Sequence, residues 1–144
     1  ILMSPVDVVL VHSVSGRNAA PVEVALYAKQ QGAKVIALTS LAYSQSVSPR
    51  SSTGYRLFEV ADLVIDNGAP AGDAIVQLYN FPQPVAPVST VLGAALANAI
   101  VAEACAILAE RGITPPVFMS ANLDGGDAHN AKLMERYNGK VLYL

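Results

Sequence analysis

The chain has 144 residues, a length typical of one domain, and we expect residues 1–144 to form a single domain. Its 9 Lys and Arg residues stand against 11 Asp and Glu residues, so the formal net charge is −2. This balance argues against a nucleic-acid partner, because phosphate backbones are normally bound by a basic surplus. Charged residues make up only 14% of the chain, where a soluble domain typically has roughly 25%. We therefore expect another subunit to cover part of the surface, in at least a dimer.

The single cysteine, Cys105, excludes an internal disulfide framework and a zinc site built from several cysteines. It favours a reducing, cytoplasmic location. The acidic pair Asp124 and Asp127 flanks two glycines, where turn and capping roles are more economical than metal binding. We expect neither a metal ion nor a cofactor.

The first forty residues predict one strand–helix–strand unit. The β-branched run Val8–Val11 is typical of a strand buried on both faces of a parallel sheet. A helix is expected over 19–31, with Asn18 as its N-cap and Gly32 after its end. The apolar run 34–39 predicts a second buried strand. This order of elements indicates an α/β fold.

Further elements follow along the chain. The patterns predict a Ser-rich functional loop over 40–54, a short helix over 55–60, strands over 63–66 and 74–78, a long helix over 89–110, a strand over 117–119, a helix over 128–137 and a strand over 141–144. Ser89 or Thr90 is the expected N-cap of the long helix, and Asp127 that of the last helix.

Residues 74–102 carry no charge, and a stretch of this length raises the question of a membrane span. Three prolines interrupt its first half, and Glu103 follows inside the long helix. We expect a buried core or interface helix, and no membrane partner.

The segment 13–18 predicts an anion site between the first strand and the first helix. Such a turn directs backbone N–H groups and the positive end of a helix dipole to one place. Ser13 and Ser15 add hydroxyl donors, Gly16 permits a tight turn, and Asn18 can donate to an anion or cap the helix. The alternative is an ordinary strand–helix turn in which Ser and Asn serve as caps, and spacing alone favours neither.

An ordered set of motifs resembles the sugar isomerase (SIS) domain. Residues 7–18 read Asp-Val-Val-Leu-Val-His-Ser-Val-Ser-Gly-Arg-Asn, and an Ala-Lys-x-x-Gly motif at 28–32 precedes a strand that ends in Thr39. The segment 59–67 resembles the third strand of the family. The segment 117–127 resembles an uncharacterised bacterial branch, whose members are described as phosphosugar or phosphoheptose isomerases. Ser89-Thr90 resembles the second phosphate-facing element of the family.

The resemblance implies a flavodoxin-like three-layer αβα sandwich with a five-stranded parallel sheet. It also implies a sugar phosphate or other carbohydrate derivative as ligand, bound near the subunit interfaces of a homodimer or homotetramer. SIS domains normally begin with helices and a strand that ends in a Gly-rich turn, whereas only six residues precede Asp7. We expect the chain to lack this first β-α unit and to be a SIS domain partial at its N-terminus. A parent protein would then carry about a hundred further residues upstream, within the size range of domains.

Two residues are candidates for acid–base chemistry, and each has a structural alternative. His129 lies at the start of the last helix, where the helix dipole favours a neutral imidazole that can act in acid–base catalysis. The alternative is a surface His beside a capping Asp. Glu103 is an acid within an apolar helix, where an apolar site could raise its pKa and let it transfer protons. The alternative is a solvated or paired Glu on an exposed face.

Three functions are compatible with this pattern. The first is aldose–ketose isomerisation of a sugar phosphate, in which a base moves a proton between adjacent carbons. The second is a sensing or regulatory module that binds a sugar phosphate without turnover. The third is a lyase or etherase that acts on an amino-sugar phosphate. An acid or base within reach of C1 and C2 of the sugar distinguishes the first from the second.

Overall fold

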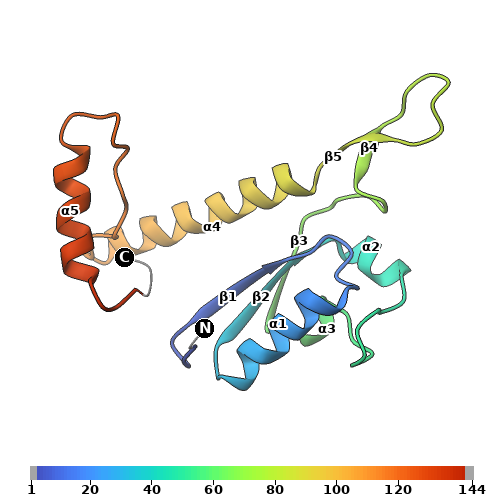
Figure 1. Ribbon diagram of the computed structural model, residues 1–144, viewed down its shortest axis with the longest axis horizontal. Helices are drawn as coiled ribbons and strands as arrows, with labels where there is room; N and C mark the ends of the chain where they lie inside the picture. The colour runs from blue at the N-terminus through green and yellow to red at the C-terminus, as the bar shows by residue number, and fades with distance from the viewer. Residues whose placement is uncertain (1–2, 142–144) are drawn as a thin grey trace. The chain divides into compact units, whose positions relative to one another are not determined.

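The computed structural model describes residues 3–141 and divides the chain into two compact units, 1–99 and 100–144. Figure 1 labels the elements. The first unit contains β1 (Val8–His12), α1 (Ala19–Gln30), β2 (Lys34–Thr39), α2 (Leu41–Ser46), α3 (Leu57–Val60), β3 (Leu63–Asp66), β4 (Ala74–Val76), β5 (Val85–Pro87) and the start of α4 (Ser89–Glu110). The second unit contains the rest of α4 and α5 (Gly126–Tyr137).

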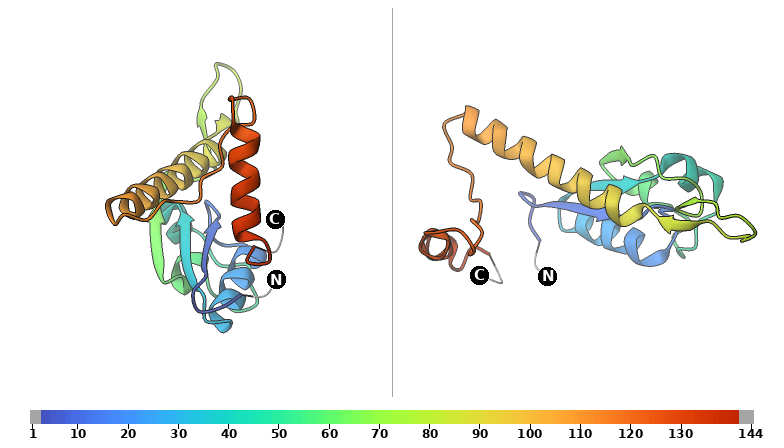
Figure 2. Two further views of the ribbon diagram at one scale, coloured as in Figure 1. Left: turned by 90° about the vertical axis from the view of Figure 1, so that its left-hand side faces the viewer. Right: turned by 90° about the horizontal axis from the view of Figure 1, so that it is seen from above.

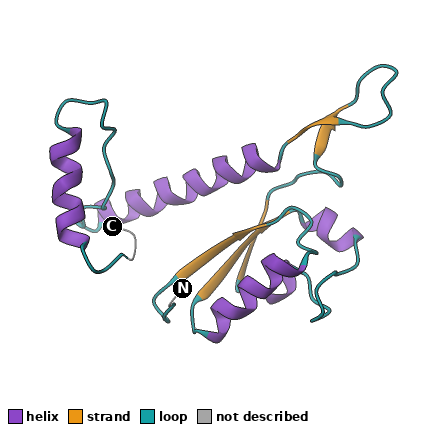
Figure 3. Cartoon of the chain, viewed as in Figure 1, coloured by secondary structure: helices purple, strands orange, loops and turns teal. Residues whose placement is uncertain are grey.

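The first three strands form a parallel sheet in the order β1-β2-β3 (Figure 3). Val8 pairs with Lys34, and Ile36 pairs with Leu63, so all three strands end at the same edge. The α/β class and the three strands expected over 8–11, 34–39 and 63–66 are confirmed. Strand–helix–strand connections require this parallel arrangement, because a helix carries the chain back to the start of the next strand.

The core lies between this sheet and the helices α1 and α3, which contact β2 and each other. Figure 2 shows α1, in blue, lying along the strands. Val22 and Leu57 from the helices and Val35 from β2 are fully buried there. Side chains alternate between the faces of a strand. On the opposite face of β1, Val8 and Leu10 are therefore left 61% and 40% exposed.

The strand expected over 74–78 does not join the parallel sheet. It is β4, which pairs antiparallel with β5 in a separate two-stranded sheet. Within residues 3–141 the parallel sheet has three strands, where the resemblance implied five. The prolines Pro82 and Pro84 place β4 and β5 on either side of a turn, and so favour a hairpin over a return to the sheet.

Two expectations for the second unit are wrong. The residues 117–119 are irregular rather than a strand; in this segment the backbone N–H and carbonyl of Met119 bond to the side chain of Asn130. The last helix begins at Gly126 with Gly125 as its N-cap, so Asp127 lies inside its first turn and is not its cap. The strand expected over 141–144 lies, apart from Val141, outside the described residues.

The long apolar helix α4 has the expected bounds, but it is not a buried core helix. An 18-residue window within it has a mean hydropathy of 2.0. By length and composition alone, the helix is long and apolar enough to cross a membrane. Only 6% of that window is buried, and Gly93 is the buried residue among the described residues of α4. Val91 and Val101 are 69% and 59% exposed.

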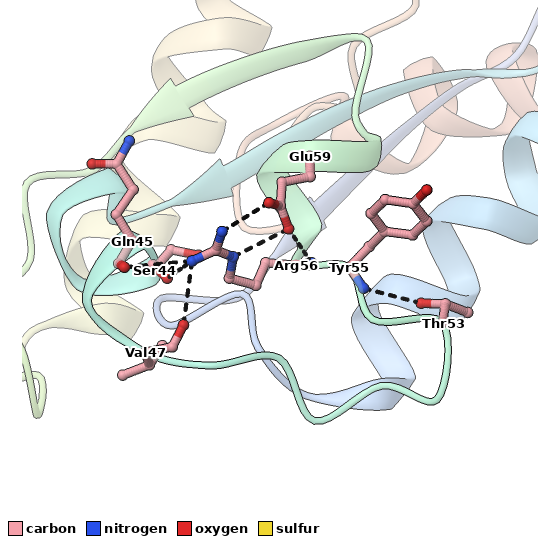
Figure 4. Close-up of polar contacts among 7 residues, drawn as sticks. All are labelled: Ser44, Gln45, Val47, Thr53, Tyr55, Arg56 and Glu59. Carbon is pink, nitrogen blue, oxygen red and sulfur yellow. Dashed lines mark hydrogen bonds and ion pairs between the residues drawn. The ribbon is translucent and has the colours of Figure 1, made fainter.

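Arg56 holds α3 against the end of α2 (Figure 4). Its guanidinium donates from Nη1 to the carbonyls of Ser44 and Val47 at 3.2 and 3.3 Å. From Nη2 and Nε it donates to the Glu59 carboxylate at 2.8 and 3.1 Å. A cation at these carbonyls satisfies groups that the short helix leaves unpaired. This contact fixes the segment that follows β2.

Two carboxylates predict a dependence of stability on pH. The Arg56 guanidinium holds the pKa of Glu59 below its usual value, and the backbone N–H of Val35, aided by Lys29, lowers the pKa of Asp62. Because these pKa values are lower in the folded than in the unfolded chain, both carboxylates stabilise the fold above about pH 4, near their ordinary values. That stability is lost as the pH falls through the lowered values.

We expect the free energy of unfolding, measured in urea from pH 7 to pH 3, to decrease in the acid range. Asp62→Asn keeps an acceptor for the Val35 N–H but removes the charge, so its profile should be flatter. Parallel profiles for the variant and the unchanged chain would contradict this assignment.

Candidate functional site

The candidate site lies where the parallel strands end. Backbone hydrogen bonds continue past the strands and fix the loops there: the Ser13 N–H donates to the Leu38 carbonyl, the Ser40 N–H to the Val14 carbonyl and the Asn67 N–H to the Thr39 carbonyl, all at 3.0 Å. The carboxyl edge of a parallel sheet is where open α/β folds bind ligands. The ends of three strands are thus held together at the edge where a ligand is expected.

A pocket of about 370 Å³ lies at this edge. Five of the six predicted ligand-binding residues line it, namely Ser13, Ser15, Asn18, Ser89 and Thr90. The sequence indicated two separate elements, the loop after β1 and the start of α4. The structure brings both to one pocket of a volume usual for small-molecule sites, roughly 300–1,000 Å³.

Gly16, the sixth predicted residue, does not line the pocket but packs the loop against α2 and α3. Its φ of +57° is in the left-handed region, and it is buried. A Cβ at this position would meet Ser44 Oγ at 2.9 Å and Leu57 Cβ at 3.3 Å. The Gly16 carbonyl also accepts a hydrogen bond from the Leu57 N–H at 2.8 Å. Only glycine combines this conformation with such close packing.

The start of α1 is open toward the loop. Asn18 stands at the N-cap position, as expected, but its side chain makes no capping hydrogen bond. The first turn of α1 contains no acidic residue. The Arg17 side chain is engaged elsewhere, donating from Nε to the Ser48 carbonyl at 2.9 Å. The positive end of the α1 dipole is therefore not offset by a carboxylate of its own first turn.

Comparison with known proteins supports the motif evidence. Residues 2–40, which include β1, the loop, α1 and β2, match the sequence model of the SIS domain. Over residues 2–40 the chain is thus similar to the SIS domain. The SIS domain is a phosphosugar-binding domain, and the matched residues contain the loop that lines the pocket.

The similarity to UPF0309 proteins extends along nearly the whole chain. It is 48% identical over 138 residues to one from Oceanobacillus iheyensis, covering 96% of this chain and 56% of that protein. One from Geobacillus thermodenitrificans is 50% identical over 96% of this chain and 55% of its own length. One from Listeria monocytogenes serotype 4b is 46% identical over 97% and 57%. The chain thus spans little more than half the length of these curated relatives.

The pocket has four further lining residues, two of which lie outside the predicted motifs. His12, Val14, Tyr43 and Asp73 complete its lining. Tyr43 comes from α2, and Asp73 lies in the turn before β4. The one available signal for Asp73 was an acidic residue after Gly72 in a turn, and turns commonly contain such residues for structural reasons.

The α4 helix approaches β1 closely at the edge of the pocket. A Cβ built on Gly93 would lie 2.6 Å from His12 Nδ1, which is closer than such atoms can pack. Gly93 therefore leaves space that the imidazole of His12 occupies.

The two candidate acid–base residues belong to the second unit. Glu103 is exposed on α4, and His129 is exposed on α5, where its Nε2 lies 3.0 Å from the Val117 carbonyl oxygen. Every residue that lines the pocket belongs to the first unit. In the part of the chain that the structure describes, no three His, Cys, Asp or Glu side chains form a group that could hold a metal ion.

Proposed function

We propose that the chain binds a sugar phosphate, with the phosphate at the Ser13–Asn18 loop. The observation that carries this proposal is the convergence of the loop and the start of α4 on one pocket of the SIS domain. Hydroxyl groups of Ser13 and Ser15 and the free start of α1 supply donors suited to phosphate oxygens. The pocket has room for the attached sugar.

The variant Ser15→Leu tests this proposal. It removes a hydroxyl and adds bulk to the pocket wall, so we expect it to abolish the stabilisation of the chain by sugar phosphates. The unchanged chain should gain about 2.7 kcal/mol at a ligand concentration of roughly 100 Kd. Thermal unfolding with increasing fructose 6-phosphate, glucose 6-phosphate and inorganic phosphate measures the effect.

Ser52→Leu is the matched control, because Ser52 is exposed and does not line the pocket. It should keep the full stabilisation by ligand. Equal stabilisation of the Ser15→Leu and Ser52→Leu variants would remove the loop from the site and overturn the proposal.

We further propose that the reaction is aldose–ketose isomerisation. In this reaction a base removes the proton from C2 of the aldose while O1 gains a proton, and the resulting enediol takes up a proton at C1 as O2 loses its own. The phosphate anchor contributes orientation, because it holds C1 and C2 in a fixed place. His129 and Glu103 remain the residues proposed for proton transfer, and loss of turnover in His129→Gln and Glu103→Gln tests them.

Binding without turnover is the second candidate function. The titratable residues that line the pocket are His12, Tyr43 and Asp73. Neither His129 nor Glu103 is among them, and this favours binding without turnover. A chain that binds sugar phosphates but does not interconvert aldose and ketose phosphates would support this sensing role.

We propose that the chain assembles as a homodimer or homotetramer in the cytoplasm. The low charge content of the chain supports such an assembly. The exposed apolar residues of α4, such as Val91 and Val101, support a subunit interface on this helix. Sedimentation velocity should show at least a dimer at micromolar concentration, and Val101→Lys should shift it toward monomer. A monomer at high micromolar concentration would contradict the assembly.

A further inference from the structure

The carboxylate of Asp73 occupies the start of α4 at the pocket wall. Its Oδ1 accepts hydrogen bonds from the backbone N–H groups of Ser89 and Val88 at 2.8 and 3.2 Å. Its Oδ2 accepts from the Ser89 hydroxyl at 2.6 Å. The two expected caps of α4, Ser89 and Thr90, are thus its first helical residues. Asp73, sixteen positions before Ser89, caps the helix instead.

The two helix starts at the pocket therefore differ in charge. The start of α1 has neither an acidic first turn nor a side-chain cap, whereas the start of α4 holds a carboxylate. A phosphate group would be repelled by Asp73 and attracted to the α1 side. The charge distribution orients a sugar phosphate with its phosphate at Ser13–Asn18 and its uncharged end toward Asp73.

The Asp73 carboxylate retains acceptor capacity for a ligand. A carboxylate offers about four lone-pair sites, and the three hydrogen bonds from the start of α4 leave one on Oδ2. Asp73 lines the pocket and is partly exposed. Its φ of +71° lies in the left-handed region, which Asp and Asn tolerate better than most residues. The backbone of Asp73 thus has an unfavourable conformation at a position where its charged side chain lines the pocket.

We propose that Asp73 is a specificity-determining residue that accepts a hydrogen bond from a hydroxyl of the sugar, and that it selects monophosphates over bisphosphates. This inference rests on the proposed function, since it requires the phosphate at the Ser13–Asn18 loop. The favoured ligand class is a sugar monophosphate with free hydroxyls at the end remote from the phosphate.

Asp73→Asn tests the role of the carboxylate. Asn is as good a helix cap as Asp and tolerates positive φ, so the amide oxygen in the place of Oδ1 retains the two bonds from the Ser89 and Val88 N–H groups. The amide nitrogen that replaces Oδ2 cannot accept a hydroxyl proton. By isothermal titration we expect fructose 6-phosphate and glucose 6-phosphate to bind about tenfold more weakly, as the loss of a hydrogen bond to a charged group predicts. Inorganic phosphate should bind equally well or more tightly.

Asp66→Asn is the matched control. Asp66 also accepts from backbone N–H groups at this sheet edge, those of Leu41 and Gly68, but it does not line the pocket. It should leave the binding of both kinds of ligand unchanged. Equal weakening of phosphate and sugar phosphates by Asp73→Asn, or the same effect from Asp66→Asn, would assign Asp73 a purely structural role and overturn the inference.

The unchanged chain provides a test independent of folding. Fructose 1,6-bisphosphate should bind at least tenfold more weakly than fructose 6-phosphate, because its second phosphate would face Asp73. Equal or tighter binding of the bisphosphate would overturn the inference while leaving the phosphate site intact. Failure of inorganic phosphate and sugar phosphates alike to bind the unchanged chain would instead contradict the proposed function itself.

Discussion

Gly16→Ala is expected to lower the free energy of unfolding by about 2–5 kcal/mol. The positive φ costs a residue with a Cβ about 1–2 kcal/mol, and the contacts with Ser44 Oγ and Leu57 Cβ add an overpacking cost of about 1–3 kcal/mol. The new methyl group would press against the end of α2 and the start of α3, which support the ligand loop. Urea unfolding at neutral pH measures the change.

Gly54→Ala separates the two causes. Gly54 has a φ of +76° but nothing within 4 Å of its built Cβ, so this variant bears only the conformational cost. We expect Gly16→Ala to be the more destabilising of the two and to weaken phosphate binding as well. Equal losses in the two variants would show that the loop is not packed as described.

Gly93→Ala is expected to destabilise the chain although alanine is the better helix former. The substitution favours α4 itself by about 1 kcal/mol. The new Cβ, however, would overlap the imidazole of His12 and force the ring out of its place. Overpacking of this kind costs about 1–3 kcal/mol. We therefore expect a net loss of stability and a change in ligand affinity, because His12 lines the pocket.

The double variant Gly93→Ala with His12→Ala identifies the cause. Removing the imidazole relieves the overlap, so the double variant should be more stable than Gly93→Ala alone. A double-mutant cycle in urea gives the interaction energy between the two positions. Additive effects would mean that the ring and the helix do not meet, and would contradict the described approach of α4 to β1.

The first strand–helix–strand unit was predictable because its signals are local. A β-branched run, a small polar loop and a helix that ends at Gly32 each specify their own conformation over a few residues. The loop 13–18 was found for the same reason. Its position fixes it at the carboxyl edge of the sheet, whatever the rest of the chain does.

The rest of the site depends on contacts between distant segments. Asp73 caps a helix that begins sixteen residues later, and no local sequence pattern predicts such a contact. Similarly, the strand predicted over 74–78 is present as β4 over 74–76. Its sequence does not specify which strand it pairs with, and it pairs with β5. The residues 117–119 are also apolar, yet here side chain–backbone bonds from Asn130 replace a strand ladder.

The most direct test of the central claim is an experimental structure of the chain with a bound sugar phosphate. We expect phosphate oxygens within about 2.7–3.2 Å of donors of the Ser13–Asn18 loop, with the sugar extending toward Asp73. Phosphate at the start of α4 in place of the Asp73 carboxylate, or a sugar phosphate bound outside this pocket, would contradict it.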